Sequence, residues 1–213
     1  MTELVAIETA GAAPARAALE RTIGSGGMAL FPADGLYGLA CDPMQAGAIA
    51  RINALKGRDP GKPSAVLYFS PLAMRELVSS LGPRTRDALA ALLPGPVTLV
   101  VANPERRYPL ACAEHPERLG VRLIAGPLAG AAAAIFQTSA NRSDEPAPAS
   151  FADVDPAIVE AADLAIDGGE LTGLPSTVVD VTGIERGEEP VILREGALSR
   201  EEVLRRLEPG RDR

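Results

Sequence analysis

The chain has 213 residues, 46% of them hydrophobic and 23% charged, which is ordinary for a globular protein that buries a core. A net charge of -7 excludes a protein whose whole surface binds nucleic acid, although it leaves room for a local basic patch. The only cysteines, Cys41 and Cys112, and the only histidine, His115, are too few for a structural zinc site or a disulfide scaffold.

Short runs rich in Val, Ile and Leu, each bounded by Gly, Pro or Asn, predict buried strands. In chain order these runs are 27–32, 64–70, 96–102, 120–125, 134–140, 162–168, 176–182 and 190–196. Helical periodicity predicts helices over 14–27, 43–57, 70–82 and 199–207. Because strands and helices alternate but hairpin-like neighbours also occur, we expect a single mixed α/β (α+β-like) domain over 1–213, with a disordered tail at 208–213.

The N-terminal segment has acidic residues where a signal peptide requires basic ones, and it lacks a continuous apolar core. The most apolar run, 123–136, is too short to span a bilayer and is interrupted by Gly and Pro. We therefore expect a soluble, cytoplasmic protein with no membrane partner.

The segment "LKGRDPGKP" (55–63) carries both lysines of the chain, Lys56 and Lys62, with Arg58 between them. Three cations on a Gly/Pro loop suit the oxygens of a phosphate chain. The alternative is a solvated loop whose cations lie near a helix C-terminus, where the helix dipole favours them.

Two further segments place hydrogen-bonding groups where a strand meets a loop. "QTSANRSDEPAP" (137–148) offers Thr138, Ser139 and Asn141, and "DGGELTGLPSTVVDVTG" (167–183) is a Gly-rich loop that enters a strand through Ser176 and Thr177. Such groups can bind a nucleotide or an anion, but they are equally typical of caps and turns. Neither segment fits the dinucleotide fingerprint or the Walker A pattern.

Three charged residues lie within or at the end of apolar strands, where an unpaired charge is costly. Arg122 and Arg194 are each expected to have an anionic partner, either a carboxylate or a ligand. Asp34 follows the strand 27–32 and either contacts substrate or caps the next loop, of which we favour the structural role. His115 lies in a polar stretch without a nearby nucleophile, so a triad mechanism is not expected.

Taken in order, seven segments resemble the YrdC/Sua5 family of threonylcarbamoyl-AMP synthases. The segments are "PADGLYGL" (32–39), "KGRDPGKP" (56–63), "PGPVT" (94–98), "VR" (121–122), "TSANRSDEP" (138–146), "GLPSTVVD" (173–180) and "LREG" (193–196). The resemblance covers about residues 12 to 205 and corresponds to the short, single-domain form. It implies a twisted, open mixed sheet with helices and a deep concave pocket.

The resemblance also implies a reaction in which L-threonine, bicarbonate and ATP form threonylcarbamoyl-AMP and pyrophosphate, with Mg²⁺ bridging the phosphates. A separate transferase then modifies an adenosine beside the tRNA anticodon. By motif, the nucleotide site comprises Lys56, Arg58, Thr138, Ser139, Asn141, Ser176 and Arg194, with Lys56 and Arg58 as catalytic residues. Substrate-binding residues are Asp34, Tyr37, Lys62, Arg122 and Thr177, and no protein metal ligand is assigned.

The sequence departs from the family pattern at two threonines, which are replaced by Ala33 and Gly35, and at a glycine, which is replaced by Asp144. These departures concern the amino-acid half of the pocket more than the nucleotide half. Three alternatives remain open at this point: a YciO-like relative without synthase activity, a protein that binds double-stranded RNA in ribosome maturation, and a catalytically decayed protein that binds ATP without turnover. Steep loss of binding with added salt would identify the RNA-binding protein.

Overall fold

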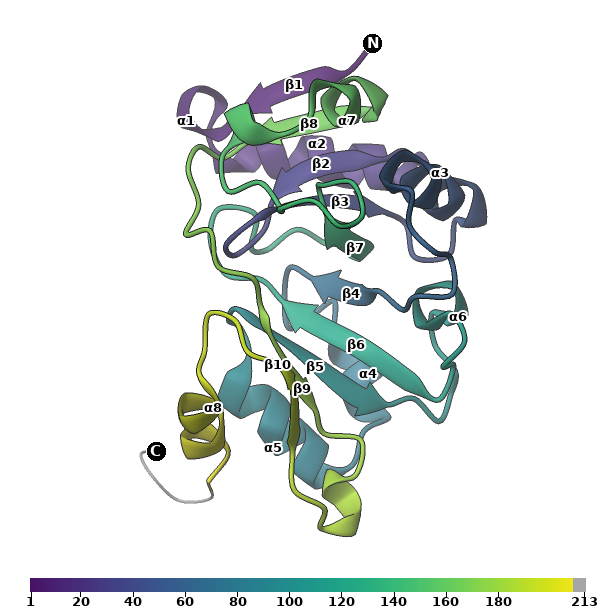
Figure 1. The fold of residues 1–213 in the computed structure, drawn as a ribbon, viewed down its shortest axis with the longest axis vertical. Coiled ribbons are helices and arrows are strands. Elements are labelled where there is room, and N and C mark those ends of the chain that lie inside the picture. The colour runs from purple at the N-terminus through teal and green to yellow at the C-terminus, as the bar shows by residue number, and fades with distance from the viewer. Residues whose placement is uncertain (209–213) are drawn as a thin grey trace.

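The computed structural model describes residues 1–208, and ten strands in this part of the chain form one open sheet (Figure 1). Its order is β1-β8-β2-β3-β7-β4-β6-β5-β9-β10, with both parallel and antiparallel neighbours. The strands are β1 Glu3–Ala6, β2 Ala29–Pro32, β3 Tyr37–Cys41, β4 Ala65–Tyr68, β5 Val97–Ala102, β6 Arg118–Leu123, β7 Ala134–Ser139, β8 Leu164–Asp167, β9 Thr177–Asp180 and β10 Val191–Arg194. The prediction of an open mixed sheet is confirmed.

All eight predicted strands are present, and two further strands were not predicted. The first, β1, is only four residues long, has no buried residue, and pairs parallel to β8 at the sheet edge. The second, β3, follows the loop at Asp34 and is fully buried between β2 and β7. Each strand has a partner far away in the sequence, β8 for β1 and β7 for β3, and short-range patterns do not show such partners.

The α-helices are α1 Ile7–Ala10, α2 Ala12–Gly24, α3 Ala46–Lys56, α4 Arg75–Ser79, α5 Pro83–Leu92, α6 Pro109–Cys112, α7 Pro156–Ala161 and α8 Arg200–Leu207. Three of the predicted helices correspond to α2, α3 and α8. The prediction over 70–82 is too long, because only α4 is helical there and turns precede it. The predicted tail at 208–213 falls, apart from Glu208, outside the described residues.

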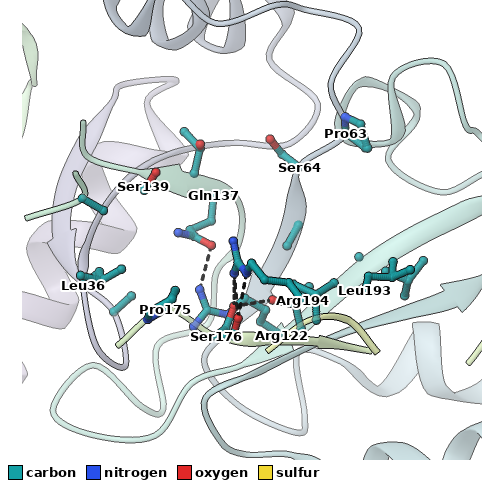
Figure 2. A pocket seen from close by; sticks show the side chains of 18 of the residues that line it. Leu36, Pro63, Ser64, Arg122, Gln137, Ser139, Pro175, Ser176, Leu193 and Arg194 are labelled. Carbon is teal, nitrogen blue, oxygen red and sulfur yellow. Dashed lines mark hydrogen bonds between the residues drawn. The ribbon is translucent and has the colours of Figure 1, made fainter. Parts of the chain in front are cut away.

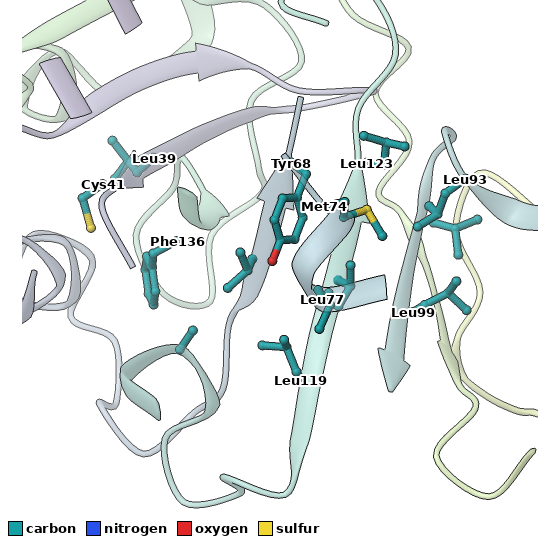
Figure 3. Packing of buried hydrophobic residues seen from close by; sticks show 14 of the residues in the cluster. Leu39, Cys41, Tyr68, Met74, Leu77, Leu93, Leu99, Leu119, Leu123 and Phe136 are labelled. Carbon is teal, nitrogen blue, oxygen red and sulfur yellow. The ribbon is translucent and has the colours of Figure 1, made fainter. Parts of the chain in front are cut away.

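Two hydrophobic clusters pack on opposite faces of the sheet, and neighbouring residues of a strand alternate between them. On β4, Val66 belongs to the first cluster and Leu67 to the second. The first cluster contains Leu99, Leu119, Leu123 and other side chains shown in Figure 3. The second cluster packs against α2 through residues such as Leu19.

The face that carries the second cluster is apolar along only part of each central strand. On β6, Leu119, Val121 and Leu123 point into the first cluster, so Arg118 and Arg122 point to the other face. Both of these arginines line a cavity there. The candidate site therefore lies on the sheet face that α2 covers elsewhere.

Candidate functional site

A cavity of about 510 Å³ lies over the central strands, between the loop after β2 and the loops that lead into β4, β6 and β9. Figure 2 shows Leu36 and Pro175 on one side of this cavity and Pro63 and Leu193 on the other. The polar or charged lining residues are Tyr37, Arg58, Ser64, Thr98, His115, Arg118, Arg122, Gln137, Thr138, Ser139, Ser176 and Arg194. The predicted concave pocket is thus present.

Small side chains form the floor of the cavity. Gly120 pairs with Ala65 of β4 on one side and Val100 of β5 on the other, and all three line the cavity. A Cβ atom at Gly120 would lie 3.3 Å from the Cα of Ala65, which is tighter than ordinary contact. A glycine at this position therefore keeps the floor open between Arg118 and Arg122.

Arg122 has the anionic partner that its place in an apolar strand required. Its Nη2 donates to Oδ2 of Asp34 at 2.6 Å, and its Nη1 donates to Oε1 of Gln137 at 3.0 Å. The two charged side chains are only 8% and 10% exposed. Asp34 therefore holds Arg122 in the pocket wall, and its own side chain is not part of the cavity lining.

Burial opposes the charge of both partners in this ion pair. It raises the pKa of Asp34, while the neighbouring Arg122 acts in the opposite direction. It likewise lowers the pKa of Arg122, which Asp34 opposes. The Nε of Arg122 is buried and has no hydrogen-bond partner within residues 1–208.

Arg194 has no carboxylate partner among the ion pairs of residues 1–208. Its Nη2 donates to the carbonyl oxygen of Ser176 at 2.7 Å and to the Ser176 hydroxyl at 3.3 Å. That hydroxyl in turn lies 2.9 Å from Oγ1 of Thr98 on β5. Figure 2 shows Arg194 reaching across the cavity toward Ser176 and Arg122. Its charge is therefore available to an anion in the cavity.

Arg58 lines the cavity and is held by its own loop. Its Nη1 donates to the carbonyl oxygen of Lys62 at 2.8 Å, and its Nη2 donates to that of Pro63 at 2.9 Å. Burial lowers the pKa of Arg58. The side chain of Lys62 is exposed and is not part of the lining, so of these two cations the structure brings only Arg58 into the cavity.

Lys56 is only 4% exposed and lies behind the cavity wall. Its Nζ donates to the carbonyl oxygens of Ser139 and Asn141, so it ties the end of α3 to the loop after β7. Burial, with a smaller effect of Arg58, lowers the pKa of Lys56 to about 8. The Asn141 amide donates within its own loop, to the carbonyl oxygens of Arg142 and Glu145. In this structure both side chains order the loop that carries Ser139.

Two of the predicted substrate-binding residues are held by internal hydrogen bonds. The Tyr37 hydroxyl donates to the carbonyl oxygen of Gly169 at 2.8 Å and accepts from the Gly168 N–H at 2.9 Å, and burial raises its pKa to about 12. Tyr37 still contributes to the cavity lining. The fully buried Thr177 hydroxyl accepts from the N–H of Leu198 at 2.9 Å, so it fixes the chain after β10.

Sequence reasoning missed several lining residues, among them Thr98, Arg118, His115 and Gln137. Thr98 is the last residue of the segment "PGPVT" (94–98), which indicated the family but predicted no role for this residue. The spacing of Arg118, Gly120 and Arg122 was a usable signal, because alternate residues of a strand share a face. The loop with His115 carried no comparable signal, since tertiary contacts bring it to the cavity.

A family model described as "Telomere recombination" (Sua5/YciO/YrdC) matches residues 21–196. The chain belongs to the Sua5/YciO/YrdC family. This membership confirms the resemblance that the seven sequence segments indicated.

The chain is similar to a threonylcarbamoyl-AMP synthase of Chromohalobacter salexigens, with 38% identity over 176 residues that cover 79% of this chain and 91% of the relative. It is also similar to the crystal structure of P. abyssi Sua5 complexed with L-threonine, with a TM-score of 0.81, 28% identity and coverage of 97% of this chain. The match spans 60% of that Sua5 chain. The structure of E. coli YciO has a TM-score of 0.73 at 23% identity, with 92% of this chain and 97% of YciO covered, and this likeness shows the fold alone.

Of the three departures from the Sua5/YciO/YrdC pattern, Ala33 and Gly35 line the cavity and Asp144 does not. A Cβ atom at Gly35 would lie 2.2 Å from the carbonyl oxygen of Leu174 and 2.8 Å from Oγ1 of Thr172. The N–H of Gly173 also donates to the carbonyl oxygen of Gly35 at 2.9 Å. The loop before β9 therefore occupies the space that a side chain at position 35 would need.

Within residues 1–208, no group of three or more His, Cys, Asp or Glu side chains is arranged to hold a metal ion. In the same part of the chain, no helix is long and apolar enough to cross a bilayer. The polar lining is cationic and hydroxylic, a donor set that suits an anionic ligand.

Proposed function

We propose that this chain is an L-threonylcarbamoyladenylate synthase, which converts L-threonine, bicarbonate and ATP to threonylcarbamoyl-AMP and pyrophosphate. The observation that carries the proposal is the convergence of separate family segments on one cavity, which brings Arg58, Ser139, Ser176 and Arg194 together. Relatives that are 38% and 33% identical to this chain are named threonylcarbamoyl-AMP synthase, so the chain is an enzyme. Its class is nucleotidyltransferase.

The chemistry begins when the threonine amine attacks the carbon of bicarbonate: a C–N bond forms, a C–O bond breaks, and water leaves with a proton from the amine, which gives a carbamate. A carbamate oxygen then attacks the α-phosphorus of ATP, a new P–O bond forms, and the bond to the bridging oxygen of the β-phosphate breaks. Pyrophosphate leaves with that electron pair. Such a transfer requires in-line positioning and neutralisation of phosphate charge, and no covalent protein intermediate.

The cationic lining supplies that neutralisation. Arg58 and Arg194 take part in no ion pair within residues 1–208, so they carry net positive charge into the cavity. Thr138, Ser139 and Ser176 supply hydroxyls for the adenylate. Lys56 and Asn141 act by ordering the loop with Ser139, and they reach the phosphates directly only if that loop moves on binding. Mg²⁺ enters with the nucleotide, as its phosphate complex.

The other end of the cavity suits the amino acid. Arg122 is held by Asp34 and Gln137 and lines the cavity, where its guanidinium suits a carboxylate such as that of threonine. P. abyssi Sua5 is known as a complex with L-threonine, which supports the same ligand here. The product would pass to a separate tRNA-modifying transferase in the cytoplasm.

The test is pyrophosphate release from ATP with L-threonine and bicarbonate, each omitted in turn. We expect release only when all three are present, and threonylcarbamoyl-AMP as the other product. Release that does not depend on threonine would overturn the proposal and would favour a YciO-like relative. No release, together with RNA binding that falls steeply with salt, would favour the RNA-binding alternative.

A further inference from the structure

The connection between β8 and β9, residues 168–176, passes the central strands on the side of the cavity. Six strands separate β8 from β9 in the sheet order, so this connection has to cross from one half of the sheet to the other (Figure 1). Leu174, Pro175 and Ser176 of this connection line the cavity. Residues 171–176, which we call the strap, therefore form part of the cavity wall.

Backbone hydrogen bonds fix the strap on both sides of Leu174. Before it, the N–H of Gly173 donates to the carbonyl oxygen of Gly35 at 2.9 Å. After it, the carbonyl oxygen of Pro175 accepts from the N–H of Ala197 at 2.9 Å. The backbone of Leu174 is thus held between the loop after β2 and the segment after β10.

The absence of a side chain at Gly35 sets how closely the strap approaches the Asp34 turn (residues 33–36). A Cβ atom at Gly35 would clash with the carbonyl oxygen of Leu174 and would approach Oγ1 of Thr172. The same turn holds Arg122, because Oδ2 of Asp34 accepts from its Nη2 at 2.6 Å. One turn therefore positions both the arginine of the amino-acid end and the strap.

The Asp34 turn and the strap present an apolar surface to the cavity. Ala33 and Leu36 of the turn line it, as do Leu174 and Pro175 of the strap. Leu174 is 52% exposed, so its side chain does not serve to fill the core. A ligand that covers this side chain removes apolar surface from water, which favours a ligand with an apolar group at this wall.

We propose that Leu174 is a specificity-determining residue that contacts the methyl group of L-threonine and thereby discriminates against L-serine. This inference rests on the proposed synthase function. With the substrate carboxylate at Arg122, the substrate side chain comes within reach of the Asp34 turn and of the strap fixed to it. L-Serine lacks only the methyl group, and one methyl group in an apolar site changes selectivity by about 10–200-fold.

The first experiment measures the affinity of the full chain for L-threonine and for L-serine by calorimetry. We expect the wild type to bind L-threonine about tenfold or more tightly than L-serine, and this ratio to fall severalfold in Leu174→Ala. Leu193→Ala is the matched control, because Leu193 is 53% exposed and lines the opposite side of the cavity (Figure 2). It should keep the wild-type ratio. An unchanged ratio in Leu174→Ala, or no binding of L-threonine to the wild type, would overturn the proposal.

The second experiment moves the strap without changing Leu174. Because a side chain at position 35 would clash with the strap, Gly35→Ala should displace Leu174 and lower the ratio of L-threonine to L-serine affinity severalfold. Gly47→Ala is the control, since no atom lies within 4 Å of a Cβ atom at that position. A folded Gly35→Ala variant with the wild-type ratio would overturn the role of Gly35 in positioning Leu174.

The specificity role and the synthase function fail in different ways. An unchanged affinity ratio in Leu174→Ala, with intact threonine-dependent release of pyrophosphate, would overturn the specificity role and leave the synthase function standing. A lowered ratio without any threonine-dependent release would support the contact and overturn the synthase function. In an active enzyme, Leu174→Ala should lower kcat/KM for L-threonine severalfold, while kcat/KM for L-serine and the KM for ATP change less than about twofold.

Discussion

The two ends of the cavity carry the same kind of ion pair in different surroundings. At one end, Arg122 and Asp34 are 8% and 10% exposed, and Gln137 completes their hydrogen bonds. At the other end, the Arg118 side chain is 37% exposed, its partner Asp180 is 15% exposed, and the unpaired Arg58 lies nearby. The first pair is suited to hold one fixed geometry, whereas the second end keeps solvent access and net charge for an incoming anion.

Asp34→Ala tests the buried end most directly. It leaves Arg122 charged and buried without its partner, so we expect the free energy of unfolding to fall by about 3–5 kcal/mol. Urea denaturation measures this change. The double variant Asp34→Leu/Arg122→Met should recover much of the stability, because it removes both charges. A loss below about 1 kcal/mol for Asp34→Ala would mean that the pair is not desolvated as described.

The buried cation Lys56 is expected to make the free energy of unfolding depend on pH. Its pKa of about 8 lies below the usual value of 10.5, so between these pH values the unfolded chain binds more protons than the folded chain. The free energy of unfolding contributed by this group is therefore lowest below pH 8 and rises toward pH 10.5, by up to about 3 kcal/mol. The free energy of unfolding is measured from pH 8 to 10.5 for the wild type and for Lys56→Met, and the difference between the two gives the contribution of Lys56. A difference that does not change with pH over this range would contradict the prediction.

Arg58→Ala tests the solvent-accessible end through activity. Removing an unpaired cation from the end of the cavity where we propose that phosphate binds should lower turnover at least tenfold, a loss of about 1.4 kcal/mol or more of transition-state stabilisation. Steady-state release of pyrophosphate measures it, with Arg75→Ala as the exposed control. If the rate is unchanged, the phosphates are held elsewhere.

The coupling between Arg118 and Asp180 gives the smallest effect. A double-mutant cycle on stability with Arg118→Gln and Asp180→Asn should yield about 1 kcal/mol or less, because the arginine is partly solvated. The same cycle on Arg122 and Asp34 should give a larger coupling. Equal couplings at the two ends would remove the distinction between them.

Part of the site could be predicted from particular residues in the sequence. Arg122 and Arg194 were expected to need partners because each lies in an apolar strand, and for Arg122 that partner is Asp34. The preference for a structural role of Asp34 agrees with its place outside the cavity lining. Lys56 and Lys62 were grouped with Arg58 by spacing alone, yet they lie in different surroundings, because Lys56 is the buried last residue of α3 and Lys62 lies on an exposed loop.

Local chemistry was sufficient to predict the eight strands, three of the helices and the family, because apolar periodicity and short motifs act over a few residues. Long-range packing decided the rest. The strand β3 and the loop with His115 are brought to the cavity by strand pairing and loop contacts across many residues. The pairing of Asp34 with Arg122 is of the same kind, since 88 residues separate the two partners. Local sequence patterns do not show which distant residues will pair, because only the formation of the sheet brings them together.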